Sequence, residues 1–243
     1  MKDAVTEQAV KKPPRGIIGP EEVRQAAQVL QKYKEGKANL EQRIIGNEQW
    51  YKLLHWGQLR QEGKAGPGEC EPASAWLFNS IANKHADAMD SFPKPNVLPR
   101  EEGDREDAKM LSSVLPVILE RNGFEQTYSD VWWYKLKSGT GVYGVFWNPR
   151  LENGLGDIDI RKLDLLNLFW EPGISDIQQS RNLFSVELMD NRTLESRYPQ
   201  LKGQLGGDVI DVARYIYDDT VDTSEKTVVV DWYYKTEEAD GGK

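Results

Sequence analysis

The chain has 243 residues, of which 39% are apolar and 29% charged, and it carries eight Trp, ten Tyr and six Phe. A chain of this length buries a core without disulfides or metals, and so many aromatic residues exclude disorder of the whole chain. One Cys and two His are too few for a disulfide framework or a zinc cluster. No apolar run reaches the ~20 residues of a membrane helix, and the N-terminus lacks the apolar segment of a secretory signal. We therefore expect an intracellular chain without membrane contact.

Charge is distributed unevenly along the chain. Residues 1–64 carry 12 Lys and Arg against 8 acidic side chains, whereas residues 65–243 carry 19 against 31. Proteins that hold DNA without sequence preference use a basic stripe that displaces counterions from the phosphates. The acidic bulk of this chain therefore indicates that gripping the DNA backbone is not its main task.

Helical patterns follow a polar N-terminal arm. The arm covers residues 1–19, and Pro20 with two following Glu residues is typical of a helix start. Apolar spacing predicts helices over 21–35, 38–56, 73–90, 104–122 and 124–136. We expect an interruption at Gly36, a kink at Pro116, and a helix end at Gly123. Three prolines predict an extended segment over 92–99.

Two of these helices have a well-defined apolar face. The helix over 73–90 carries a stripe that includes His85, and the helix over 104–122 places four aliphatic residues on one side. The four residues are Leu111, Val114, Leu115 and Ile118. Both faces are predicted to pack against other elements.

From Gly139 the apolar period changes from 3.6 to 2. Residues 142–147 and 157–161 alternate on either side of Asn153-Gly154, which predicts a β-hairpin. Further strands are predicted at 168–170, 183–188 and 227–234, with a short helix at 191–197. The last strand, followed only by a polar end, is interpreted as one arm of an unfinished hairpin that lacks its antiparallel partner.

Helices come first and mainly antiparallel strands after, so the fold class is α+β. We divide the chain into a flexible arm with the first helix (1–36), a helical part (37–138) and a β-rich part (139–243).

Two glycine-rich motifs resemble nucleotide loops but lack the required context. Residues 139–144 match G-x-G-x-x-G, yet a helix precedes them and a strand follows, the reverse of the order in a dinucleotide site. Residues 57–64 resemble a phosphate loop, but five residues separate the glycines and Ala65 replaces the Ser or Thr that binds magnesium. We therefore expect turns here and no cofactor.

The titratable residues give one catalytic alternative. Asp157 and Asp159 share a face of one strand, as in a magnesium-dependent nuclease, but alternating charge on the solvent face of a hairpin is the far commoner cause of this pattern. His85 is predicted to be a hydrogen-bonded packing residue. His55 has no acidic neighbour in sequence, and Cys70 has no accompanying His motif. We assign no catalytic, cofactor-binding or metal-binding residue.

The β-rich half carries an ordered series of short motifs. Gly139-Thr140-Gly141 leads from a helix into a strand, a hairpin follows, and Asp164-Leu165-Leu166-Asn167-Leu168-Phe169 runs into Glu171-Pro172. Upstream, residues 40–55, with Arg43 and Asn47, and residues 72–90 have the pattern of two preceding helices. Over roughly residues 40–234 this order resembles the wing region of tailed-bacteriophage portal proteins.

The resemblance implies a structural protein that is not an enzyme. Portal proteins form a ring, usually of twelve subunits, at one capsid vertex. The terminase large subunit drives double-stranded DNA in through the ring, and the DNA later leaves through it. The implied partners are further copies of the chain, the terminase, capsid and tail adaptor proteins, and DNA that passes without tight binding. The implied location is the virion, and the host cytoplasm during assembly. Portal proteins are longer and continue into a stem and a clip, which implies that the chain is either an N-terminal portion of a portal protein or the product of a degenerate prophage gene.

Aromatic residues are expected to serve the core first and subunit contacts second. The residues in question are Trp132, Trp133, Trp147 and Trp170. The alternative to the portal interpretation is an α+β interaction module whose basic N-terminal segment binds an acidic partner or nucleic acid. Such a module would stay monomeric and bind with a steep salt dependence.

Overall fold

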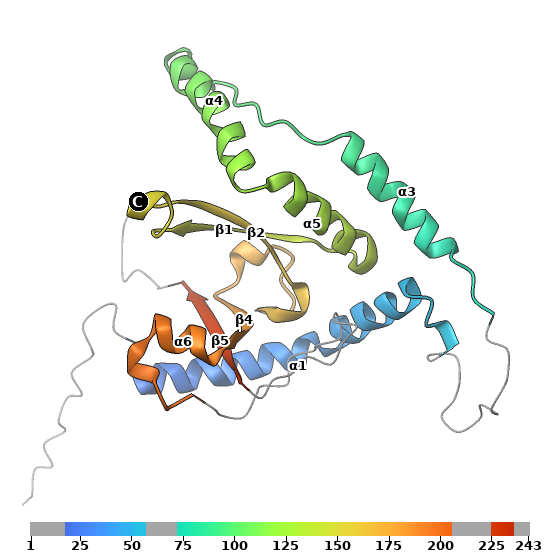
Figure 1. The fold of residues 1–243 in the computed structure, drawn as a ribbon, viewed down its shortest axis with the longest axis vertical. Coiled ribbons are helices and arrows are strands. Elements are labelled where there is room, and N and C mark those ends of the chain that lie inside the picture. Colours follow the sequence, from blue (N-terminus) through green and yellow to red (C-terminus); the bar gives the residue numbers. More distant parts are fainter. Residues whose placement is uncertain (1–17, 57–71, 206–224, 236–243) are drawn as a thin grey trace, which may run out of the picture.

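A single long helix, α1 (Pro20–Tyr51), runs beneath the β-strands in the computed structural model, which describes residues 18–56, 72–205 and 225–235 (Figure 1). It begins as predicted, because Pro20 occupies the first turn and the Glu22 carboxylate accepts a hydrogen bond from the Gly19 amide. The expected interruption at Gly36 is wrong, since α1 continues through it to Tyr51.

Gly36 is instead a point of close approach between α1 and the β-rich half. A Cβ at Gly36 would lie 2.6 Å from Cγ of Pro172. Glycine inside a helix lowers its stability by about 1 kcal/mol relative to alanine. Here that loss allows a distant loop to lie directly against the helix backbone.

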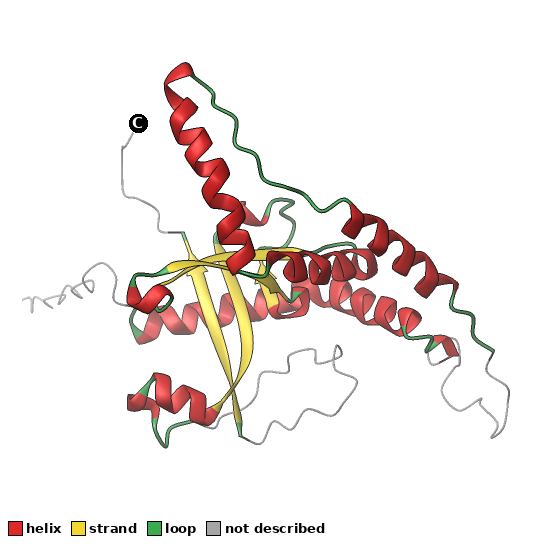
Figure 2. Ribbon diagram, turned by 45° about the horizontal axis from the view of Figure 1, so that its top comes forward, coloured by secondary structure: helices red, strands yellow, loops and turns green. Residues whose placement is uncertain are grey.

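Three further helices build an arm above α1. They are α3 (Trp76–Asp90), α4 (Arg105–Arg121) and α5 (Phe124–Ser138), preceded at α4 by the short 3-10 turn η1 (Glu102–Asp104). Their positions confirm the predicted helices. Gly123, with φ of +56°, makes the sharp turn between α4 and α5. While α5 packs on α1 and α3, α4 contacts α5 near their junction and projects away from the body (Figures 1 and 2).

The predicted hairpin is confirmed. Strands β1 (Val142–Asn148) and β2 (Asp157–Leu163) pair antiparallel, with Val142 opposite Leu163 and Asn148 opposite Asp157. The 3-10 turn η2 (Glu152–Gly154) lies in the connection. Helix α5 packs against β2, so the hairpin is joined to the helical arm.

A second sheet has three antiparallel strands in the order β3-β4-β5. They are β3 (Leu168–Trp170), β4 (Asn182–Asp190) and β5 (Lys226–Tyr234). The expectation that the last strand lacks a partner is wrong. β5 pairs with β4 along its whole length, from Asn182 opposite Tyr234 to Asp190 opposite Lys226. The partner precedes it in the chain and is separated from it by α6 (Asn191–Arg197) and η5 (Pro199–Leu201).

The helices and the antiparallel strands together confirm the α+β class. Within the described residues, no helix is both long and apolar enough to cross a bilayer.

The core lies between α1 and the second sheet, in two clusters. One joins Ala26, Leu30 and Tyr33 of α1 to Phe169, Phe184 and Val186. The other joins Ile44 to Leu165 and Leu166 of the turn η3 (Leu165–Asn167). Each cluster therefore needs α1 on one side and the segment around β3 on the other.

Lys37 lies between these two clusters and is buried. Its Nζ donates to the carbonyl oxygens of Leu166 and Leu168, each at 2.9 Å. It also lies 4.2 Å from the centre of the Phe169 ring and 3.6 Å from a carboxylate oxygen of Glu41. Burial lowers the pKa of Lys37 from 10.5 to about 8, although Glu41 and other acidic groups oppose the shift.

The turn that receives Lys37 is fixed by Asp164. The Asp164 carboxylate accepts from the Leu166 amide at 2.9 Å and caps η3. Burial raises the pKa of Asp164 above its usual value, and the nearby Lys37 counteracts this. The motif Asp164 to Phe169 is therefore the segment that docks the sheet on α1.

We predict that Gly36→Ala lowers the free energy of unfolding by about 1–3 kcal/mol, because the new methyl group overlaps Pro172. Adding Pro172→Ala to this variant should recover part of the loss, since it removes the overlapping Cγ. Urea unfolding followed by tryptophan fluorescence measures both changes. Gly103→Ala is the matched control, because a Cβ there meets no atom within 4 Å. A Gly36→Ala chain more stable than the wild type would contradict the close approach.

We further predict that the stability of the protein rises between about pH 8 and pH 10.5. In that window the unfolded chain keeps the Lys37 proton that the folded chain releases, so higher pH favours folding. At 1.36 kcal/mol per pKa unit the full gain is about 3 kcal/mol. The pKa of tyrosines such as Tyr51 is raised in the folded chain, which lowers the stability of the protein as the pH rises above about 10. This effect is the same in every variant.

The pH test compares the wild type with Lys37→Met by urea unfolding from pH 7 to pH 10. The difference in unfolding free energy between the two should change with pH, because only the wild type titrates at residue 37. Lys32→Met, on the exposed side of the same helix, should follow the wild-type profile. Parallel profiles for wild type and Lys37→Met would contradict the depressed pKa.

Candidate subunit interface

Exposed apolar side chains gather on the arm and the hairpin. Contiguous apolar surface larger than a few hundred Å² on a soluble protein usually marks an interaction site. The exposed apolar residues of these elements include Trp76, Leu77 and Phe78 on α3, Met110, Leu111, Val114 and Val117 on α4, and Tyr143, Val145 and Trp147 on β1. These surfaces are therefore candidate contacts with other chains.

Helix α4 presents the longest exposed apolar stripe. Met110, Val114 and Val117 follow one another at helical spacing and are 56%, 44% and 49% exposed, and Leu111 lies beside them. We call these four residues the α4 stripe. The four residues of the apolar face predicted for this helix do not share one environment. Leu115 and Ile118 are partly buried, whereas Leu111 and Val114 are exposed.

The inner side of α4 is held by the extended segment that precedes it. The Ser112 hydroxyl accepts from the Val97 amide at 3.0 Å and donates to the Val97 carbonyl at 3.3 Å. This contact fixes the orientation of the helix, so the α4 stripe faces away from its own chain.

The hairpin exposes one face of β1. Strand alternation places Tyr143, Val145 and Trp147 on the same side, and Val145 and Trp147 are 65% and 64% exposed. The expectation that Trp147 belongs to the core is therefore wrong. Its ring lies over the turn at Gly156, where a Cβ would come within 2.5 Å of the indole. The other three tryptophans of that prediction, Trp132, Trp133 and Trp170, are partly buried.

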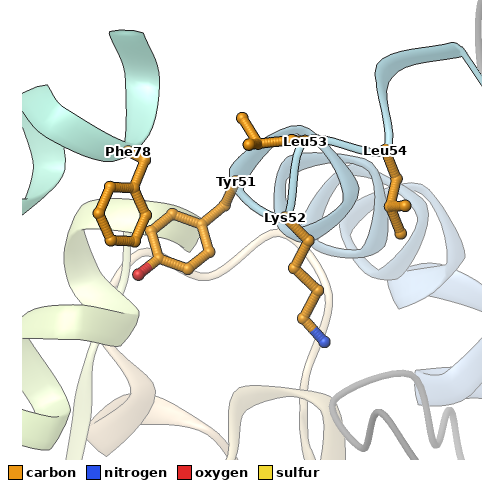
Figure 3. A pocket seen from close by; sticks show the side chains of 5 residues that line it. All are labelled: Tyr51, Lys52, Leu53, Leu54 and Phe78. Atoms are coloured by element: carbon orange, nitrogen blue, oxygen red, sulfur yellow. The ribbon is translucent and has the colours of Figure 1, made fainter. Parts of the chain in front are cut away.

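A shallow apolar pocket lies between the end of α1 and α3. Tyr51, Lys52, Leu53, Leu54 and Phe78 line about 490 Å³, and the Tyr51 and Phe78 rings face each other 5.4 Å apart (Figure 3). Burial and the neighbouring Glu48 raise the pKa of the Tyr51 hydroxyl. The lining offers apolar contact and one cation, but no acid or base positioned for catalysis.

A second groove, of about 480 Å³, lies between α5 and the start of β1. Its lining includes Tyr128, Trp132, Lys135 and Tyr143 together with the turn 139–141. The Lys135 ammonium lies 4.1 Å from the Trp132 ring. We call this feature the α5 groove.

The glycine motif at the end of this groove is a helix-to-strand turn, as predicted. Gly139 ends α5 with φ of +82°, and β1 follows. A Cβ at Gly141 would lie 2.5 Å from Cγ1 of Val131, so glycine is required there for close packing of the turn on α5.

The candidate metal pair, Asp157 and Asp159, has other neighbours in the structure. Asp157 lies 3.3 Å from the guanidinium of Arg121, which also reaches Glu152 at 3.1 Å. Asp159 is opposite Phe146 in the hairpin. Among the residues that the structure describes, no group of three or more His, Cys, Asp or Glu side chains is placed to hold a metal ion.

Both histidines make local contacts. His85 stacks on Trp133 with ring centres 4.3 Å apart, and its Nε2 lies 3.0 Å from the Ser129 hydroxyl, which confirms the predicted packing role. His55 lies against Trp50 and its Nε2 is 3.1 Å from the Trp50 carbonyl. The predictions for Cys70 and for the glycine-rich turn at residues 57–64 fall outside the described residues.

Two polar residues that sequence reasoning did not single out hold the arm and the hairpin in place. The Asn122 amide donates to the carbonyls of Ile118 and Ile158, and its oxygen accepts from the Ile160 amide at 2.8 Å. Asn122 thereby joins the end of α4 to β2. Lys137 of α5 contacts Glu48 of α1 at 2.8 Å. Neither residue stands in a recognisable motif.

Asn47, one of the residues quoted for the resemblance to portal proteins, also joins α1 to the end of α5. Its side-chain amide donates to the Lys137 carbonyl at 2.9 Å. Helix α1 is thus bonded to both the backbone and the side chain at the end of α5.

Comparison with known proteins identifies a matching family. A family model described as phage P22-like portal protein matches residues 86–241, which is more than half of the chain. The matched range begins in the last turns of α3, extends past the end of β5, and includes the α4 stripe and the α5 groove. No curated protein matches the chain.

We predict that Asn122→Ala lowers the free energy of unfolding by about 2–3 kcal/mol, because three hydrogen bonds are lost and two strand groups of β2 lose their partner. Asn122→Asp should have an intermediate effect, since it retains the acceptor but not the donors. Urea unfolding measures both. A loss below about 0.5 kcal/mol for Asn122→Ala would contradict its role as the joint between α4 and the hairpin.

Proposed function

The chain belongs to the phage P22-like portal protein family, and from this premise we propose that it is a subunit of the ring at one vertex of a phage capsid. In this role the terminase large subunit drives DNA in through the ring, and the DNA leaves through it toward the tail. The ring, of twelve subunits in its complete form, contacts capsid and tail adaptor proteins. Its location is the virion, and the host cytoplasm during assembly.

The match over residues 86–241 is the observation that carries this proposal. The exposed surface of the same residues supports it. A helix that projects from the body with four apolar residues on its outer side gains stability when a neighbouring chain covers it. Ring subunits provide such a cover by repeating one contact around an axis.

The charge distribution supports passage of DNA without tight binding. Residues 65–243 carry 31 acidic against 19 basic side chains, and tight phosphate contact depends on clustered Lys and Arg. Part of the basic charge in the first 64 residues is also used within the fold, because Lys37 is buried against two carbonyl oxygens. This weakens the alternative of an adaptor that binds nucleic acid through that segment.

A structural role is also favoured over a metal-dependent nuclease. The Asp157 carboxylate that such an enzyme would need is paired with Arg121. We therefore propose no catalytic step for this chain.

The test is the molar mass of the purified 27.7 kDa chain by light scattering, at rising concentration and at two salt levels. We expect multiples of the monomer mass that increase with concentration. Met110→Ser with Val114→Ser should weaken self-association about tenfold or more without loss of stability, because both side chains are exposed in the monomer. Val23→Ser, an exposed apolar change on α1, is the matched control and should have little effect.

Binding of a labelled DNA duplex, measured by fluorescence anisotropy, completes the test. We expect weak binding. A chain that stays monomeric at every concentration and binds the duplex tightly with a steep salt dependence would contradict the proposed function and support the adaptor alternative.

A further inference from the structure

The α4 stripe begins with two acidic residues. Glu106 is four residues before Met110 and Asp107 three before it, so both lie on the same side of the helix as the stripe. Both are exposed, and neither forms an ion pair with a described residue. They lie at the outer end of α4, the part of the arm farthest from the body (Figures 1 and 2). The stripe is therefore apolar along its length and negative at its tip.

The α5 groove has the complementary character. Tyr128, Trp132 and Tyr143 give it an apolar and aromatic lining, and Lys135 adds a positive charge. Lys135 is exposed, and its ammonium contacts the Trp132 ring but no carboxylate among the described residues. A helix with an apolar side and an acidic end matches this lining in polarity and charge.

The stripe and the groove of one chain lie on successive helices, which the sharp turn at Gly123 directs away from each other (Figure 1). Helix α4 meets the start of α5 and projects away from it (Figure 1), whereas the groove follows α5 to the turn 139–141 after its last residue. Asn122 and Ser112 hold α4 in that direction. A contact between the two surfaces therefore needs two copies of the chain.

The hairpin is a weaker candidate for the groove. It is also apolar, but the acidic residues near its tip, Glu152 and Asp157, already contact Arg121. The α4 stripe, in contrast, ends in two acidic side chains for which no ion pair is found among the described residues.

We propose that the α4 stripe of one subunit lies in the α5 groove of the next, with Glu106 and Asp107 facing Lys135. This proposal rests on the proposed ring function and names the contact that builds it. The contact is heterologous, since each chain gives its α4 to one neighbour and its groove to the other. Repetition of such a contact closes into a ring when the rotation fits and otherwise continues as a filament.

Charge reversal tests whether Glu106 and Asp107 face Lys135 of the neighbouring chain. Lys135→Glu alone, or Glu106→Lys with Asp107→Lys, should weaken self-association about tenfold at low salt, because like charges then meet. Combining all three changes in one chain should restore association to near the wild-type level. Glu120→Lys is the matched control, because this exposed residue lies on α4 outside the stripe. Urea unfolding of each variant separates weaker association from loss of fold.

Disulfide trapping tests the contact directly. In a Cys70→Ser background, Val114→Cys and Thr140→Cys are made in separate chains. Neither chain should crosslink with itself, whereas a mixture of the two should give a disulfide-linked dimer under mild oxidation. A chain carrying both cysteines should give a ladder of linked oligomers. Self-crosslinking of Val114→Cys would indicate a symmetric contact between stripes and overturn the proposal.

The outcomes separate the two proposals. If the charge reversals do not change self-association and no mixed disulfide forms, the pairing of stripe and groove is wrong, but the ring function is not contradicted. A wild-type chain that is monomeric at every concentration would overturn the pairing, and tight, salt-dependent binding of the DNA duplex by that monomer would overturn the ring function as well. A disulfide within one monomeric chain that carries both cysteines would show that the stripe covers its own groove, and would also overturn the pairing.

Discussion

A buried ammonium group, held by two carbonyl oxygens, fixes the β-rich half of this protein on its first helix. Lys37 contacts the turn between Leu166 and Leu168, and the two core clusters lie on either side of it. Removing a charge from water is unfavourable, and the two carbonyls, Glu41 and the Phe169 ring offset part of that loss. Next to it, Gly36 lets Pro172 lie against the helix. The motifs Asp164 to Phe169 and Glu171-Pro172 therefore have a structural reason, since they form the docking segment.

The helical arm is attached differently, through a few polar contacts at its base. Asn47 and Glu48 bond the end of α5 to α1, and Asn122 bonds the end of α4 to the hairpin. Beyond these joints the inner side of α4 is held by Ser112 against the preceding extended segment, while the α4 stripe on its outer side stays exposed. An element that is oriented by its base but left uncovered along its length is suited to contact with a neighbouring chain, because the direction is fixed while the surface stays available.

Patterns typical of enzymes have packing explanations in this fold. The glycines at 139 and 141 serve a turn that packs closely on α5, and His85 fills a gap against Trp133. Asp157 belongs to an ion pair with Arg121, an arrangement that positions the hairpin relative to α4. These residues hold helices and strands in position, which agrees with a family of structural phage proteins.

The sequence by itself determined the local elements and the family. Pro20, Gly123 and the alternation around Asn153-Gly154 act within a few residues, so helix starts, turns and the hairpin were predicted close to their observed bounds. Tertiary structure decided the rest, including the continuity of α1 through Gly36, the pairing of β5 with β4, the burial of Lys37 and the exposure of Trp147. Each depends on a partner far along the chain or on its absence. Local propensity carries no information about such partners, because burial is a property of the assembled fold.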